Sequence, residues 1–150
     1  MFINRIKSDN VTISEEDLLK IEKEYDFKFP NDLREFYLIY NGGMPERNEV
    51  YLELEDWHAI TKFHGFYAIK KNGQCPLEKI LKTNYHEEWW IRWLIPFGYD
   101  EGGEDFCFSI RESDYGSIYY VSSDCVDEDN PEETLILVAD SFKKFINKMK

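Results

Sequence analysis

The sequence predicts an α+β domain in which an antiparallel sheet of hairpins has helices packed mainly on one face. Two amphipathic helical patterns come first, short alternating segments separated by glycine turns follow, and another helical pattern closes the chain. Strands joined by hairpins favour an antiparallel sheet, which the helices at the two ends of the chain are then expected to cover. A length of 150 residues suits one domain, and residues 1–150 are predicted to form it.

The N-terminal third of the chain is predicted to be a pair of helices. The first begins at Ser14, whose side chain can cap the amide three residues along, and it ends near Asp26. The second begins at Pro30 and carries an apolar stripe that places Phe36 in the core. Because glycine tolerates the left-handed backbone with which many helices end, Gly42 is predicted to stop this helix with a positive φ.

The middle of the chain is predicted to form the sheet, because apolar and polar residues alternate there in short runs. The predicted strands are 50–54, 66–69, 94–99, 106–110 and 118–121, and a short helix is predicted over 76–82. Pro96 lies inside one strand and cannot donate to a neighbouring strand, which predicts an edge or a bulge there. A closing helix, capped by Asp140 or Ser141, carries Phe142 into the core.

The acidic residues of the chain are concentrated in one segment. The formal net charge is −12, and residues 96–133 hold twelve acidic residues and a single basic one, Arg111. A surface of this sign repels nucleic-acid phosphates and anionic membranes, so neither is expected as a partner, whereas a basic protein is. Two interpretations of the segment stay open: a binding face, and a surface that only promotes solubility.

The cysteines predict a reducing compartment. Cys75, Cys107 and Cys125 are odd in number and widely spaced, which does not fit a disulfide framework and favours free thiols. The first residues contain no apolar run of signal-peptide length, and no stretch reaches the ~20 apolar residues that span a bilayer. The protein is therefore expected in the cytoplasm.

The sequence contains no recognisable pattern of catalytic or ligand-binding residues. The cysteines and histidines lack the paired spacing of zinc ligands, and the acidic run 124–129 lacks the framework of a calcium-binding loop. The two Gly-Gly pairs, at 42–43 and 102–103, stand in turns without the lysine and hydroxyl residues of a phosphate-binding loop. We therefore expect no metal, no cofactor and no enzymatic activity.

Three motifs occur in a characteristic order. Residues 29–43 form a helical pattern that ends in Asn-Gly-Gly, residues 95–108 hold a Pro-Phe strand, a glycine turn and an aromatic strand, and residues 139–146 begin with Ala-Asp-Ser-Phe. Together they resemble the SUKH superfamily, which includes fungal Smi/Knr-type regulators of cell-wall synthesis and many bacterial immunity proteins. The resemblance implies a single α+β domain without cofactor or catalytic residues.

The resemblance also implies a function in protein binding. In bacteria it implies an immunity protein, the antidote to a polymorphic toxin that is often a nuclease or another intracellular enzyme. An acidic inhibitor fits a nuclease, because a nuclease must present a basic surface to phosphate. The alternative is a regulatory scaffold module that recruits signalling or cell-wall-synthesis proteins. We expect a monomer, with a dimer as the alternative state.

The candidate partner-binding residues lie at one glycine turn of the acidic segment and on the loop that follows the hairpins. The acidic candidates are Asp100, Glu101, Glu104 and Asp105 at the turn and Asp127, Glu128 and Asp129 on the loop. Tyr99 and Tyr119 are candidate anchors, because aromatic side chains supply much of the binding energy of interfaces, whereas charges at the rim set the association rate. Packing in the core is the alternative for both tyrosines.

Overall fold

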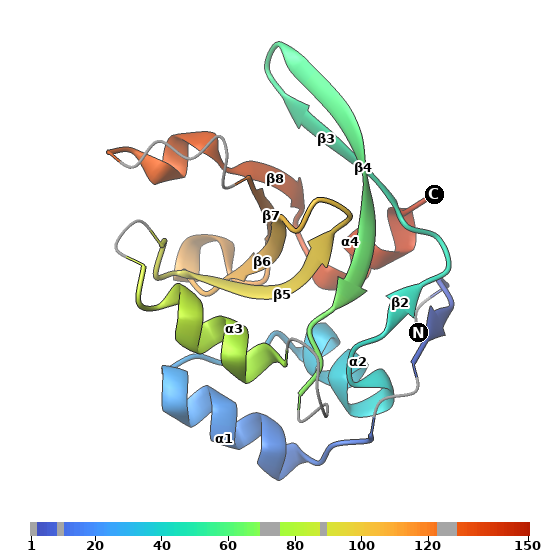
Figure 1. Ribbon diagram of the computed structural model, residues 1–150, viewed down its shortest axis with the longest axis vertical. Helices are drawn as coiled ribbons and strands as arrows, with labels where there is room; N and C mark the ends of the chain where they lie inside the picture. The colour runs from blue at the N-terminus through green and yellow to red at the C-terminus, as the bar shows by residue number, and fades with distance from the viewer. Residues whose placement is uncertain (1–2, 9–10, 70–75, 88–89, 123–128) are drawn as a thin grey trace.

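A six-stranded antiparallel sheet forms the centre of the fold, and helices of the described ranges cover it, with the first helix lying outside the third (Figure 1). The computed structural model describes residues 3–8, 11–69, 76–87, 90–122 and 129–150. The helices are α1 (Glu15–Tyr25), α2 (Asn31–Tyr40), α3 (Leu77–Asn84) and α4 (Phe142–Lys148). The predicted α+β class is confirmed.

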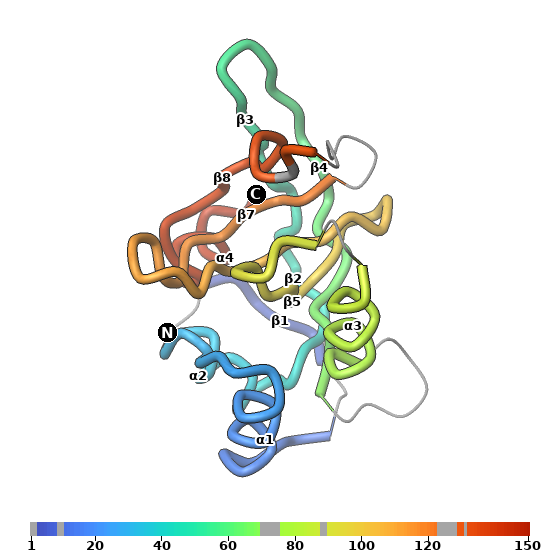
Figure 2. The backbone as a smooth tube through the Cα atoms, turned by 90° about the vertical axis from the view of Figure 1, so that its left-hand side faces the viewer, coloured from blue at the N-terminus to red at the C-terminus, as the bar shows by residue number. Residues whose placement is uncertain are grey.

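The strands of the sheet follow one another in sequence order, from β3 to β8, each antiparallel to the next. They are β3 (Glu49–Leu54), β4 (Trp57–Phe66), β5 (Leu94–Asp100), β6 (Asp105–Ser109), β7 (Ile118–Val121) and β8 (Ile136–Ala139). A separate pair joins β1 (Ile6–Lys7) to β2 (Met44–Pro45), and single 3₁₀ turns occur at η1 (Glu112–Asp114) and η2 (Pro131–Thr134). Because β3 also approaches β8, the sheet curls toward a barrel, from which the β3–β4 hairpin projects (Figures 1 and 2).

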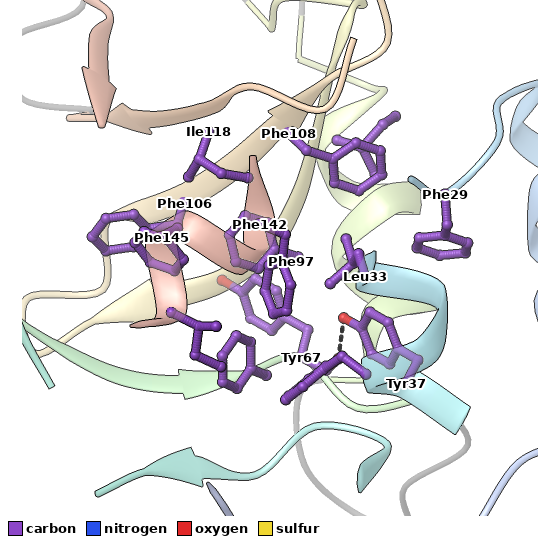
Figure 3. Close-up of a cluster of buried hydrophobic side chains, with 14 of the residues drawn as sticks. Phe29, Leu33, Tyr37, Tyr67, Phe97, Phe106, Phe108, Ile118, Phe142 and Phe145 are labelled. Atoms are coloured by element: carbon purple, nitrogen blue, oxygen red, sulfur yellow. Dashed lines mark hydrogen bonds between the residues drawn. The ribbon is translucent and has the colours of Figure 1, made fainter. Parts of the chain in front are cut away.

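The core lies on one face of this curled sheet, and all four helices contribute to it. Phe97 of β5 and Phe106 of β6 face Phe142 and Phe145 of α4, and none of these four side chains is exposed (Figure 3). The ring of Phe36 on α2 lies 5.2 Å from that of Phe142, which confirms both predicted core residues. The opposite face carries a smaller apolar cluster that includes Trp90, Ile91 and Leu94.

The end of α2 shows why the strand predicted over 66–69 is wrong. Asn41 and Gly42 both have positive φ, of 47° and 100°, so the helix stops where it was predicted to stop. The buried Asn41 amide then donates to the Ile69 carbonyl (2.6 Å) and accepts from the Ile69 N–H (2.8 Å), and the Tyr37 hydroxyl donates to the Tyr67 carbonyl (2.8 Å) (Figure 3). The Tyr67 N–H still donates to the Phe97 carbonyl of β5 (2.9 Å), but side chains pair the Tyr67 carbonyl and both backbone groups of Ile69, and the regular strand β4 ends at Phe66.

The strand with Pro96 contains a bulge. β5 lies between β4 and β6, which excludes the edge position, and its pairing with β6 shifts between Pro96 and Gly98. A Cβ atom at Gly98 would lie 2.4 Å from Cζ of Phe63 on β4, so only glycine allows the two strands to approach here. At the start of α4, the Ser141 hydroxyl accepts from the Lys144 N–H (3.1 Å), so Ser141 is the residue that caps this helix.

Candidate protein-interaction surface

Asp100 stands at the end of β5 and holds the following turn in place. Its Oδ1 accepts from the backbone N–H groups of Gly102 (3.0 Å) and Glu104 (2.9 Å). Its Oδ2 accepts from the hydroxyls of Thr61 on β4 (2.7 Å) and Tyr120 on β7 (2.7 Å). Only 4% of Asp100 is exposed, because these four donors surround the carboxylate. The sequence placed Asp100 among the contact residues, whereas the structure gives it an internal role.

Asp105, at the start of β6, also faces inward. Its carboxylate accepts from the Tyr67 hydroxyl (2.6 Å) and lies 3.5 Å from the side-chain nitrogen of Asn84 on α3. Burial raises the pKa of Asp105 to about 6, against the opposing effect of these two hydrogen bonds, and the charges of Glu104 and Asp100 raise it further. Asp105 therefore connects the sheet to α3 and is not a free surface charge.

The remaining acidic candidates of the described ranges are open to solvent to different degrees. Glu101 is exposed, and Glu104 is half-buried beside it in the turn. Asp129 is exposed, and the neighbouring acids Glu132 and Glu133, which were not among the predicted residues, are exposed as well. The other two predicted residues, Asp127 and Glu128, lie outside the described residues, as do Cys75 and Cys125.

Tyr99 is half-buried rather than projecting. Its ring stacks on that of Tyr67, with 5.1 Å between centroids, and lies 5.4 Å from the ring of His64. Both of these neighbours come from the β4 side of the sheet. Tyr99 therefore packs within the protein with part of its surface accessible.

Tyr119 belongs to a cluster on the face of the sheet opposite the helices. Its hydroxyl donates to Asp114 (2.5 Å) and accepts from Arg111 (3.3 Å), and its ring lies 5.6 Å from that of Trp93. The Arg111 guanidinium sits 3.4 Å above the Trp93 ring centroid, and the Trp93 indole N–H donates to Glu132 (3.0 Å). Hydrogen bonds from Arg111 hold the pKa of Asp114 at about 2, so Asp114 stays charged as part of this cluster.

The described ranges hold neither a cluster of metal-binding side chains nor an exposed cysteine. In the described ranges, no group of three or more histidine, cysteine or acidic side chains is arranged to hold a metal ion. Cys107 is buried in the sheet, and burial raises the pKa of its thiol well above the usual value. Among the described helices, none combines the length and apolar character that a membrane span requires.

A profile described as the SMI1 / KNR4 family (SUKH-1) matches residues 12–148. The chain belongs to this family. A search of the curated proteins found no match to the chain. The SUKH group comprises immunity and regulatory proteins that act through protein interactions.

In this SUKH-1 chain the three motifs lie at structural junctions. The Asn-Gly-Gly motif contributes Asn41, which ties the end of α2 to Ile69. The second motif contributes Gly98, where β5 closely approaches β4, and the third contributes Ser141, which caps α4. Asn41, Gly98 and Ser141 therefore hold junctions of the fold, and the partner has to be inferred from other residues on the surface.

Proposed function

We propose that this SUKH-1 protein is an immunity protein that binds and neutralises a basic toxin domain. The binding region is the acidic surface, which consists of Glu101, Glu104, Asp129, Glu132 and Glu133. The observation that supports this most directly is the division of the acidic segment into two groups. The carboxylates of Asp100, Asp105 and Asp114 accept hydrogen bonds within the protein. The side chains of the acidic surface are turned wholly or partly to solvent, and Glu132 among them also accepts from the Trp93 indole N–H.

The register of the sheet supports a common location for the acidic surface. Asp105 pairs with Val121, and Tyr120 pairs with Ile136, so the β5–β6 turn and the start of β8 lie at the same end of the sheet. Charges of one sign that gather at one end produce a field that extends into solvent. Such a field speeds the encounter with a basic domain, which an antidote requires because it must act before its toxin does.

The β5–β6 turn is also rigid before a partner binds. The four hydrogen bonds of Asp100 fix the backbone of Gly102 and Glu104 and connect it to β4 and β7. Binding therefore orders little of this part of the protein, and less of the interaction free energy is lost to conformational entropy. A rigid acidic turn of this kind favours tight recognition of one basic surface.

A nuclease is the class of toxin that this surface fits best. Its substrate groove must be basic in order to bind phosphates, and acidic side chains of an inhibitor can occupy the same groove. In this proposal the protein acts as a single domain over residues 1–150, without a cofactor, in the cytoplasm where such a toxin does its damage.

The test is to mix the purified protein with the toxin domain encoded beside its gene. We expect a stoichiometric complex by isothermal titration calorimetry and loss of the toxin's activity at equal concentration. Co-expression should restore the growth of cells that the toxin otherwise kills. If no complex forms, the immunity proposal fails, and the scaffold interpretation of the family takes its place.

A further inference from the structure

The β3–β4 hairpin extends beyond the body of the protein, and its outer part has no core to pack on (Figures 1 and 2). Val50, Leu52 and Phe63 anchor the base of the hairpin in the core, with at most 3% of each exposed. Beyond them, every residue from Glu53 to His58 is exposed. This outer part of the hairpin is therefore a ribbon of two strands with both faces open to solvent.

Large apolar side chains lie on both faces of this ribbon. Leu54 and Trp57 are directly opposite each other across the strands, and they are 41% and 48% exposed. Nearer the base, Tyr51 and Ile60 form another cross-strand pair, with 51% and 63% exposed, and they line a recess together with Lys148 and Lys150 at the C-terminal end. Since neighbouring residues of a strand point to opposite faces, the two pairs occupy opposite faces. Two exposed apolar pairs at one projecting hairpin of so highly charged a protein point to contact with a partner.

The charges around these apolar pairs indicate the kind of partner. Glu53, Glu55 and Asp56 lie at the tip of the hairpin, close to Trp57. An acidic tip fits a basic surface and disfavours a second copy of this chain, whose tip carries the same charges and whose net charge is −12.

The hairpin is continuous with the acidic surface. The backbone N–H of Glu101 donates to the Lys62 carbonyl (2.9 Å) at the base of the hairpin, and the Thr61 hydroxyl donates to Asp100 (2.7 Å). These bonds fasten the stem of the hairpin to the β5–β6 turn. A partner that covers the turn can therefore also reach the hairpin, and the stem is held in a fixed direction.

We propose that the β3–β4 hairpin inserts into a cleft of the basic toxin domain and anchors the complex there. This rests on the proposed function and adds the contact that supplies most of the affinity. A cleft is required because a flat partner surface would cover only one of the two apolar faces. Trp57 and Leu54 bury their side chains against one wall, Tyr51 and Ile60 against the other, and the acidic tip meets basic residues at the cleft floor, where a nuclease holds phosphate.

The test measures the affinity of the toxin domain for two double variants, Leu54→Ala/Trp57→Ala and Tyr51→Ala/Ile60→Ala. Each pair should weaken binding at least roughly tenfold, mainly through faster dissociation, because buried aromatic anchors dominate interface affinity. The matched control is Leu19→Ala/Ile39→Ala, which removes exposed apolar side chains from α1 and α2 and should leave the affinity unchanged. Thermal unfolding of each variant verifies that it is folded.

The outcomes separate this inference from the function on which it rests. If the wild type binds the toxin domain and both hairpin variants bind equally well, the immunity function stands and the hairpin is not the anchor. If only one of the two double variants weakens binding, the hairpin does not insert into a cleft, because the partner then covers only one of its faces. If sedimentation shows a wild-type dimer that the hairpin variants break, the occupant is a second copy. If the wild type does not bind, both proposals fall.

Discussion

Asp100 and Glu101 are neighbours in the sequence, and yet one is buried with four hydrogen bonds and the other is exposed. Both precede the same Gly-Gly pair, so the local sequence gives no reason to expect that one is buried and the other exposed. The difference comes from Thr61 and Tyr120, which approach Asp100 only after β4 and β7 have assembled around β5. For this reason the sequence predicted a turn at this acidic stretch but could not separate its internal carboxylates from its external ones.

The internal role of Asp100 predicts a large loss of stability on truncation. Asp100→Ala leaves two hydroxyls and two backbone N–H groups without their acceptor in a buried site, which should lower the free energy of unfolding by about 2–4 kcal/mol. Chemical denaturation measures this loss. Glu101→Ala is the control and should stay within about 0.5 kcal/mol of the wild type, because its side chain is exposed. Equal stability of the two variants would contradict the structure.

Asp105 predicts a specific dependence of stability on pH. Its pKa is about 6 in the folded protein and 3.8 in its ordinary environment, so the folded state retains the proton more tightly than the unfolded state. The resulting stabilisation is complete below about pH 4 and is lost as the pH rises through about 6, a change of about 3 kcal/mol. Asp105→Asn keeps an oxygen acceptor for the Tyr67 hydroxyl and removes the titration.

The readout for Asp105 is the difference between the wild type and Asp105→Asn in urea denaturation across this pH range. Other carboxylates titrate in both proteins and cancel in the comparison. We expect the stability of the variant, relative to the wild type, to increase between about pH 4 and pH 7. A constant difference would show that Asp105 does not titrate in this range.

Among the elements, those with strong local signals were predicted and those shaped by distant partners were not. The helix from Glu15, the stop at Asn41 and the strands β6 and β7 follow from caps, glycine and alternation. β4 was missed because the outer half of the hairpin carries apolar side chains on both faces, which removes the alternation. β8 was not predicted either, since it is a short run that becomes a strand only by pairing with β7.

The contact between α2 and α4 predicts where the fold is most sensitive to mutation. Phe36 and Phe142 are completely buried, and their rings pack together, so Phe36→Ala or Phe142→Ala leaves a cavity between the two helices. Each change should lower the free energy of unfolding by about 3–5 kcal/mol in chemical denaturation. Ile39→Ala on the exposed side of α2 serves as the control. A loss below about 1 kcal/mol for either phenylalanine would contradict this packing.

For the whole molecule, the family fold and the partner surface are encoded by different residues. The three motifs that resemble SUKH proteins hold the junctions of the fold, and their order sufficed to predict the family that residues 12–148 match. The β3–β4 hairpin and the acidic surface lie largely outside those junctions. Sequence patterns therefore predicted the family. They did not predict the role proposed for the β3–β4 hairpin, because that role depends on how far the hairpin projects beyond the core, which only the structure reveals.

The charge of the whole molecule is unevenly distributed, and this asymmetry is central to the proposed function. If the acidic surface steers a basic toxin domain, the association rate depends on where the negative charges lie and not only on the net charge of the protein. Two variants with the same change in net charge separate these effects. One carries Glu101→Lys, Glu104→Lys and Asp129→Lys on the acidic surface. The other carries Glu16→Lys, Glu24→Lys and Glu35→Lys on the exposed sides of α1 and α2.

The most direct test is the association rate of these two variants and the wild type with the neighbouring toxin domain, at low and at high salt. We expect the wild-type rate to fall steeply as salt screens the attraction. The acidic-surface variant should associate at least roughly tenfold more slowly at low salt, with little salt dependence, while the helix variant should stay close to the wild type. If both variants associate at the same rate and with the same salt dependence, the acidic surface does not guide binding, and its charge serves only solubility.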